Sequence, residues 1–279
     1  MTKNEEIKKR LKNLKSLPTL PTIVSKLNEI VDDDEATAIS LGKIIEKDQV
    51  LTSKLLRMVN SSFFGFPQRI STVSNAIVLL GFNVIKTLVV TSSIFEVMQS
   101  SDIGLWEHSL GCAACAGILA RRRGINNPEE VSTAALIHDI GKVVIRAEMP
   151  EDYSKIMDLV LTRDIPMRKA EEEILGVQHG EIGKWLSMEW NLPDKLSIPI
   201  GFHHHPDDAP DFKDIVAIIH VSDILIRAWG FGFGGDKWVP PLDHRAWSLI
   251  KFGKKEGMEI LEELDEKLAE LKNFTMDLA

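Results

Sequence analysis

The chain has 279 residues, of which 44% are hydrophobic, so it can bury a sizeable core and is not intrinsically disordered. Its formal net charge of −8 argues against a broad nucleic-acid surface, although a local basic patch remains compatible with that charge. The two cysteines, Cys112 and Cys115, are too few for a disulfide framework.

Neither a signal peptide nor a membrane span is predicted. The N-terminal segment is charged and amphipathic and lacks the apolar core of a signal peptide. The longest apolar stretch, residues 76–90, contains Asn83 and Lys86 and is shorter than a membrane span. We therefore expect a soluble protein in the reducing cytoplasm that makes no membrane contact.

Helical periodicity dominates the first part of the chain. Ile7, Leu11 and Leu14 repeat at helical steps, and this pattern predicts a first amphipathic helix. The further helices predicted here cover 23–31, 37–47, 50–60 and an apolar pair over 72–98 that breaks near Gly81.

The second part is also helical, and convincing strand alternation and hairpin signals are absent from the sequence. The predicted helices lie near 103–123, 128–147, 150–163, 166–175, 178–190, 193–204, 212–229 and 254–273. A glycine-rich loop, 230–241, precedes the last of them. We predict an all-α fold of two packed helical subdomains.

The pattern is interrupted near 98–103, where we place a boundary. The predicted units are an N-terminal helical bundle over 1–100, a helical domain over 101–230, and the glycine-rich loop with the last helix over 231–279. Nothing resembles a long linker, so we expect the first two units to pack against each other.

All eight histidines lie after residue 100 of the chain. Two aspartates there, Asp139 and Asp223, sit within runs of Ile, Leu, Val and Ala. A buried carboxylate without a partner costs roughly several kcal/mol, so each needs a cation, a hydrogen-bond network or a metal. Without a metal, the partner of Asp139 would be a helix-terminus amide or an arginine such as Arg146.

Helical spacing turns these residues toward the core. Five predicted helices each direct a histidine or an aspartate inward, and this convergence indicates a metal site. The candidate ligands are His108, His138, Asp139, His179, His203, His204 and Asp223. Neutral imidazoles combined with carboxylates suit Fe, Mn, Zn, Co or Ni.

The order His108, His138-Asp139, Asp223 resembles the signature of the HD phosphohydrolase superfamily. The additional histidines at 179 and 203–204 resemble the fuller ligand set of the HD-GYP branch. This resemblance implies a divalent transition metal, with Fe or Mn favoured and room for two ions. It also implies catalytic roles if the site is active: Asp139 would bridge metals and Lys142 would contact phosphate.

The first half is similar to the HDOD family, a helical signalling relative of the HD domains. The resemblance rests on the segments 16–31 and 44–81, and the segment 190–206 adds to it. It covers roughly residues 10–228 and makes the C-terminal subdomain an HD-superfamily bundle.

One departure from the HD-GYP pattern bears on function. The segment 203–214, HHHPDDAPDFKD, has no Gly-Tyr-Pro motif after the histidines, and this argues against hydrolysis of cyclic di-GMP. We favour a signal-transduction output or regulatory module with a metal-binding site, whose partner is a signalling protein or a small phosphate-containing ligand. The alternative is a metal-dependent phosphohydrolase acting on a nucleotide or cyclic nucleotide, and a third possibility is a purely structural metal staple.

Other motifs favour ordinary structural roles. Cys112 and Cys115 have CxxC spacing, but they lie in mid-helix without a second pair, so we interpret them as small core residues. The glycine-rich loop 230–241 lacks a preceding strand, so it is a flexible connector rather than a dinucleotide fingerprint.

The N-terminal half contains no histidine or cysteine before residue 100, so we expect it to bind a partner or to regulate the HD-like half that it covers. Its apolar side chains include Phe63, Phe64, Phe66 and Phe82. They form either an exposed anchor for a partner or, as we slightly prefer, a plug in the seam between the halves.

Overall fold

The computed structural model describes residues 3–12, 38–61, 64, 66, 68–99 and 104–276. Over these ranges the regular structure consists of α-helices and one short 3-10 helix, and it contains no strand. The all-α prediction is therefore confirmed. The helix predicted over 23–31 lies outside the described residues.

The helices of the first part follow the predicted periodicity. They are α1 (Lys3–Lys12), α3 (Ala38–Ile45), α4 (Gln49–Val59), α5 (Val73–Leu80) and α6 (Phe82–Gln99). Asp48 caps α4 by accepting a hydrogen bond from the N–H of Leu51 at 3.0 Å. Gly81, between α5 and α6, has a φ of 82°, a conformation that favours glycine, and this produces the predicted break.

The second part contains the larger group of helices. They are α7 (Leu105–Arg122), α8 (Pro128–Leu136), α9 (Ile140–Glu148), α10 (Pro150–Arg163), α11 (Met167–Leu175), α12 (His179–Glu189), α13 (Asp194–Phe202), the 3-10 helix η1 (Pro206–Asp208), α14 (Lys213–Trp229), α15 (His244–Ile250) and α16 (Lys254–Met276). None of the described helices is both long and apolar enough to cross a membrane.

Two of these elements differ from the sequence prediction. The helix expected over 128–147 is divided into α8 and α9 by a turn that contains His138 and Asp139. Consecutive side chains on a continuous α-helix point about 100° apart, and the turn removes that restriction. The short helix α15 was not predicted; Asp243 caps it by accepting hydrogen bonds from the N–H groups of Arg245 and Ala246, each at 2.8 Å.

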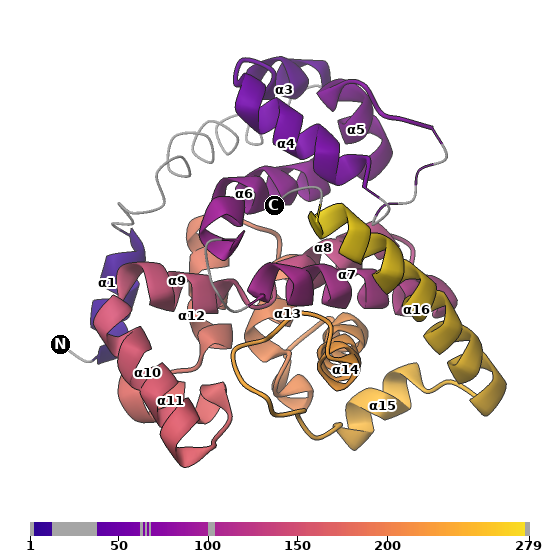
Figure 1. Ribbon diagram of the computed structural model, residues 1–279. Helices are drawn as coiled ribbons and strands as arrows, with labels where there is room; N and C mark the ends of the chain where they lie inside the picture. The colour runs from indigo at the N-terminus through magenta and orange to yellow at the C-terminus, as the bar shows by residue number, and fades with distance from the viewer. Residues whose placement is uncertain are drawn as a thin grey trace.

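The central element of the second part is α7, which Figure 1 shows among the helices that follow it in the chain. Its side chains from Leu105 to Ala120 are buried apart from that of Glu107. The helices α8, α14 and α16 pack around it. A helix that is buried on all sides is a core helix, and α7 therefore carries His108 into the interior of the protein.

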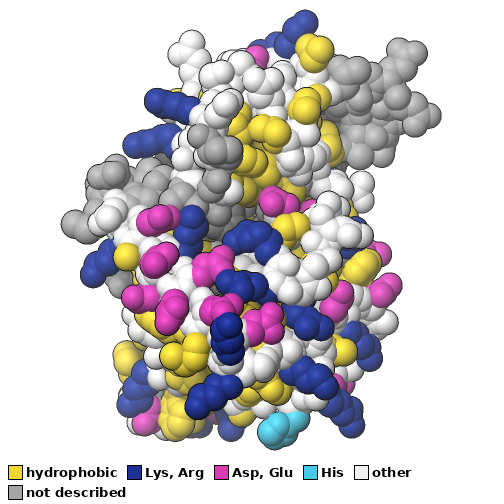
Figure 2. Space-filling model, turned by 90° about the vertical axis from the view of Figure 1, so that its right-hand side faces the viewer, with side chains coloured by type: hydrophobic (Ala, Val, Ile, Leu, Met, Phe, Trp, Pro, Cys, Tyr) yellow, Lys and Arg dark blue, Asp and Glu magenta, His cyan; other side chains and the backbone are white. Residues whose placement is uncertain are grey.

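The last helix, α16, covers α7 from outside (Figure 1). Two of its acidic residues, Glu259 and Glu263, accept hydrogen bonds from the guanidinium of Arg122 at 3.2 and 2.9 Å. On the face shown in Figure 2, basic side chains are intermixed with acidic ones. No single sign of charge dominates that face.

Contacts also join the first part of the chain to the second. Helix α6 packs against α7, α8 and α9, and α1 packs against α12. The buried Lys86 of α6 donates a hydrogen bond to the carbonyl of Asn191 at 2.9 Å. The ammonium of Lys8 lies 4.4 Å from the ring centroid of Trp185. The expected packing of the two parts is present, while the domain boundaries themselves remain predictions.

The phenylalanines after α4 are neither fully exposed nor fully buried. Phe64 and Phe66 are half-buried against the core and stack on each other, with ring centroids 6.1 Å apart. Phe82 is also half-buried, and Phe63 lies outside the described residues. The choice between a partner anchor and a seam plug therefore stays a prediction.

Helices α9 and α12 cross at close range through two glycines. A Cβ atom at Gly141 would collide with the backbone carbonyl of His179, and one at Gly183 would lie 3.3 Å from the backbone nitrogen of Gly141. A backbone carbonyl cannot move as a flexible side chain can. The close crossing brings Asp139, at the start of α9, beside His179, at the start of α12.

We predict that Gly141→Ala lowers the free energy of unfolding by about 1–3 kcal/mol, because the added methyl group forces the crossing apart. Gly257→Ala in α16 is the matched control, since nothing lies within 4 Å of its added Cβ atom. We expect it to be neutral or stabilising by up to about 1 kcal/mol. Urea unfolding followed by circular dichroism measures both, and equal stabilities of the two variants would contradict the prediction.

Candidate metal centre

All seven predicted ligand residues meet in one cluster. They come from α7 (His108), the turn before α9 (His138 and Asp139), the first residue of α12 (His179), the end of α13 (His203 and His204) and α14 (Asp223). All are buried except His204, which is half-buried. The structure thus brings together the residues that helical spacing directs inward, and their role as metal ligands remains a prediction.

The carboxylate of Asp139 lies at the centre of the cluster. Its Oδ2 atom is 3.5 Å from Nε2 of His108 and 3.4 Å from Nε2 of His138. Its Oδ1 atom is 3.2 Å from Nε2 of His179 and 3.8 Å from Nε2 of His203. Each oxygen therefore faces a different pair of imidazoles.

Three histidines of the cluster have their Nδ1 atom next to an oxygen acceptor. The pairs are His138 with the carbonyl of Ala135 at 2.6 Å, His179 with Oε2 of Glu171 at 2.7 Å, and His203 with the carbonyl of Ile200 at 2.8 Å. Because these oxygens cannot donate, Nδ1 carries the proton of each neutral ring and Nε2 keeps a lone pair.

These lone pairs converge in a buried space. Nε2 of His179 lies 3.4 Å from Nε2 of His203 and 3.1 Å from Nε2 of His204. Nε2 of His138 and Oδ1 of Asp139 are buried without a hydrogen-bond partner. Buried acceptors without a hydrogen-bond partner are costly unless a cation lies near them. Imidazole nitrogens and a carboxylate are suitable donors for a divalent transition metal, so the residues present fit such an ion.

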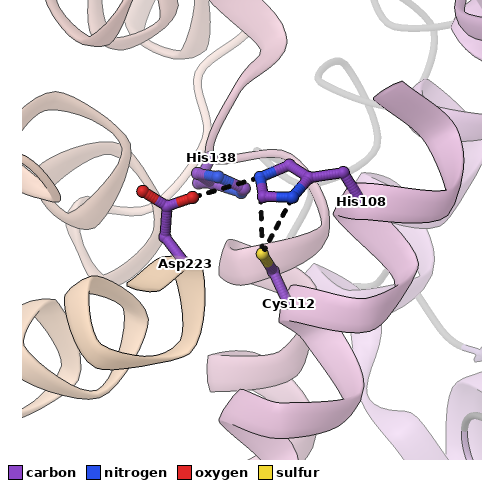
Figure 3. Close-up of side chains that lie close together, drawn as sticks. All are labelled: His108, Cys112, His138 and Asp223. Atoms are coloured by element: carbon purple, nitrogen blue, oxygen red, sulfur yellow. Dashed lines mark hydrogen bonds and ion pairs between the residues drawn. The ribbon is translucent and has the colours of Figure 1, made fainter. Parts of the chain in front are cut away.

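The possible ligand atoms form three groups, one of which, His138, Asp139 and His203, overlaps the other two. Of those two, one consists of His203 and His204 with His179. The other, shown in Figure 3, consists of His108, Cys112, His138 and Asp223, whose ligand atoms all lie within 4.8 Å of one another. Both cysteines are free and buried, as predicted for core residues. The four-residue spacing predicts that Cys112 shares a helix face with His108, but a place for Cys112 among the possible ligand atoms was not predicted.

Two buried cations balance the two aspartates. Nζ of Lys142 lies 2.7 Å from Oδ2 of Asp139, and Nε of Arg227 lies 2.9 Å from Oδ1 of Asp223. Burial alone would raise the pKa of each carboxyl group, but the neighbouring imidazoles and these cations hold both pKa values well below the usual range. The partner of Asp139 is thus Lys142 rather than Arg146, whose guanidinium lies 5.9 Å from the ring centroid of Tyr153.

The glycine-rich loop 230–241 closes over these cations. The carbonyl of Gly234 accepts hydrogen bonds from Lys142 at 2.8 Å and from Arg227 at 3.1 Å. The carboxylate of Asp236 accepts one from Arg227 at 3.2 Å and one from the N–H of Met167 at 2.8 Å. The loop is therefore part of the wall of the site, a role that its prediction as a connector did not include.

The space beside the cluster is small. A cavity of about 80 Å³ is lined by His179, His204, Lys142, Arg227 and Trp238, among others. A second cavity of about 240 Å³ is bordered by the three consecutive histidines 203–205 and by residues of α12. Pockets for drug-sized ligands occupy roughly 300–1,000 Å³, so the space next to the buried cations suits a much smaller group.

Two further residues support the cluster and were missed in the sequence. Glu171 is fully buried, and its Oε2 atom accepts hydrogen bonds from both Nδ1 and the backbone N–H of His179. Its spacing of four residues from Met167 and Leu175 placed it on a buried helix face and could have revealed it. His220 is also buried. Its Nδ1 forms a hydrogen bond with the carbonyl oxygen of His203, so we assign His220 a structural role rather than a ligand role.

Comparison with known proteins connects this site to a family. A model of the HDOD domain matches residues 17–206. The crystal structure of an HDOD domain protein of unknown function from Geobacter sulfurreducens is 28% identical, with a TM-score of 0.72 over 97% of both chains. A candidate phosphohydrolase from Shewanella amazonensis is 24% identical, with a TM-score of 0.63 over 92% of this chain and 97% of that one. At that lower identity the similarity concerns the fold alone.

A curated relative is longer than this chain. An uncharacterized protein of Treponema pallidum is 29% identical over 211 residues, which cover 73% of this chain. The match covers only 41% of the Treponema protein. The family match itself extends across the predicted boundary near 98–103, so the family resemblance involves both helical parts.

Burial sets the protonation of most histidines in the cluster. It lowers the pKa of His138, and the pKa values of His203 and His204 fall further because neighbouring imidazoles add to the effect of burial. His179 differs: burial opposes its charged form, but the carboxylate of Glu171 beside it raises the pKa overall. Most of the cluster is therefore neutral and able to donate lone pairs near neutral pH.

We predict that the metal-free protein loses stability as the pH falls below about 6.5, the ordinary pKa of histidine. Three of the cluster histidines have lowered pKa values in the folded state, so the unfolded chain binds more protons below that pH and is favoured. The raised pKa of His179 acts in the opposite direction and offsets part of this loss. Each histidine with a lowered pKa changes the free energy of unfolding by up to about 1.4 kcal/mol per pH unit.

Urea unfolding of chelator-treated protein between about pH 7.5 and 5.5 measures this dependence. His204→Gln should reduce the slope, because one buried neutral imidazole is removed. His244→Gln, at an exposed position, should leave it unchanged. Constant or increasing stability toward acid pH would show that the histidines are not held neutral.

Proposed function

This chain belongs to the HDOD domain family, and we propose that it is a signal-transduction output module whose histidine/aspartate cluster holds a divalent transition metal. The observation that supports metal binding is the convergence of imidazole Nε2 atoms around the carboxylate of Asp139. Fe or Mn, with room for two ions, remains the expectation from the family resemblance.

The proposed ligands divide on either side of Asp139. His108, His138 and Asp223 lie on one side, and the three histidines at 179, 203 and 204 lie on the other. A carboxylate with one oxygen toward each group is suited to bridging two ions. When bound, such a metal would polarise a phosphate oxygen or a water molecule.

The restricted space over the cluster favours signalling over hydrolysis. A cavity of about 80 Å³ does not admit a nucleotide, and the loop 230–241 occupies the hydrogen-bonding groups of the two buried cations. The absence of a Gly-Tyr-Pro motif after His204 points in the same direction. A module of this kind would respond to a protein partner or to a small phosphate-containing ligand.

Hydrolysis is the second candidate, and a specific contact favours it. The ammonium of Lys142 forms an ion pair with Asp139 beside the cavity. It would contact the phosphate of a substrate if its hydrogen bond to the carbonyl of Gly234 were broken. The chain also keeps every ligand-type position that its resemblance to the HD superfamily requires. A substrate would need the loop to move away first.

The first test of this proposal is metal content. We expect protein purified without oxygen to contain Fe, Mn, Zn, Co or Ni by elemental analysis. Asp139→Asn should weaken metal binding by at least about tenfold, because the charge at the centre of the cluster is removed. Asp158→Asn, at an exposed position of α10, is the matched control and should bind metal as the unaltered protein does. Equal metal content in the two variants would refute the ligand assignment.

The second test separates signalling from hydrolysis. We expect the metal-loaded protein to hydrolyse bis-p-nitrophenyl phosphate and cyclic dinucleotides no faster than its Asp139→Asn variant does, because the covered cavity excludes them. Release of p-nitrophenol and chromatography of the dinucleotides measure this. Metal-dependent turnover that is lost in both Asp139→Asn and Lys142→Met would establish the phosphohydrolase instead.

A further inference from the structure

We infer that Cys112 is a thiolate ligand of the metal, so that the donors on the His108 side of the cluster include a sulfur beside two imidazoles and carboxylate oxygens. This inference rests on the proposed metal binding and extends it to a residue outside the predicted ligand set. Figure 3 shows Cys112, His138 and Asp223 arranged around the ring of His108.

The helix spacing places both donors on one face. Cys112 follows His108 by four residues on α7, and residues four apart on an α-helix are neighbours on its surface. The same spacing brings two histidines onto one zinc ion in helices with an HExxH motif. Because α7 is buried along most of its length, its side chains have little freedom to turn away from the cluster.

The distances match those between two ligands of one ion. Sγ of Cys112 lies 3.6 Å from Nε2 of His108, and Nε2 of His108 lies 3.1 Å from Oδ1 of Asp223. In tetrahedral zinc sites, with Zn–S of about 2.3 Å and Zn–N of about 2.0–2.1 Å, a nitrogen and a sulfur donor are about 3.5 Å apart. The distance from Sγ of Cys112 to Nε2 of His108 is therefore already that expected between two ligands of one ion.

An independent observation points to a cation-binding role for the donors at this place. Nε2 of His138 belongs to the same group of donors and is buried with no hydrogen-bond partner. Cys115 provides the contrast on the same helix. It is equally buried, but its thiol bonds Ser222, and it belongs to none of the donor groups found among the described residues.

Burial and the carboxylates of Asp223 and Asp139 raise the pKa of Cys112, so its thiol stays protonated until a metal ion binds. Asp139 and Asp223 each already face a buried cation, so neutral imidazoles alone would add no negative charge to balance a divalent ion. When the metal binds, the S–H bond of Cys112 breaks, the proton leaves to solvent, and the sulfur lone pair forms the bond to the ion. A soft sulfur donor favours Zn²⁺, Co²⁺ or Fe²⁺ over Mn²⁺, and this narrows the metal expected from the family resemblance.

The experiment uses the full chain, stripped with a chelator, reduced, and titrated with Co²⁺ without oxygen. Equilibrium dialysis counts the bound ions, and absorption spectroscopy detects the near-ultraviolet charge-transfer band of a cobalt–thiolate bond. We expect the unaltered protein and Cys115→Ser to show this band with equal intensity. Cys112→Ser should lack the band and bind its first ion at least about tenfold more weakly. X-ray absorption of the zinc-loaded protein should show one sulfur at about 2.3 Å.

The outcomes separate the two proposals. Co²⁺ bound by the unaltered protein without a thiolate band would overturn the role of Cys112 and leave the histidine/aspartate site standing. A thiolate band that persists in Cys112→Ser, or that disappears only in Cys115→Ser, would also overturn the role of Cys112 as a ligand. No bound Co²⁺ and no bound Zn²⁺ in the unaltered protein would overturn both this inference and the metal-binding function.

Discussion

The buried carboxylate of Asp139 is the constraint on which the interior of this protein depends. It lies in the turn before α9 and faces imidazoles on both of its oxygens, so three other segments, which carry His108, His179 and His203, must bring their side chains to it. A charge in such a place is tolerated only when partners surround it. Lys142 supplies the nearest positive charge from the same helix, one turn away.

The glycine-rich loop accepts hydrogen bonds from the same cations that neutralise the two aspartates. A single carbonyl, that of Gly234, accepts hydrogen bonds from both Lys142 and Arg227, so the loop and the two aspartates share their cations. Glycine is required where the loop passes α7, because a Cβ atom at Gly232 would collide with the backbone of His108. Any displacement of this loop would leave two buried cations without one of their acceptors, which links its position to the state of the cluster.

Helix packing sets the precision of the site. The α9–α12 crossing depends on Gly141 and Gly183, whose missing side chains let two backbones approach closely enough for Asp139 and His179 to meet. Helix α7, which is buried from Leu105 to Ala120 apart from Glu107, presents its small and apolar residues to its neighbours. The core is therefore close-packed around the cluster, so the helices hold the ligand atoms in well-defined positions.

The sequence by itself determined the helical class, most helix boundaries and the inward direction of the histidines and aspartates, because these follow from a local period of 3.6 residues. Only the tertiary structure decided the break at His138, the pairing of Asp139 with Lys142 rather than Arg146, and the approach of Cys112 to the cluster. The turn at His138 and the meeting of Cys112 with His138 and Asp223 depend on contacts between segments distant in the chain, whereas the pairing of Asp139 with Lys142 is local and depends on where α9 begins. Periodicity states which face of a helix is buried, but it does not state which side chains meet there.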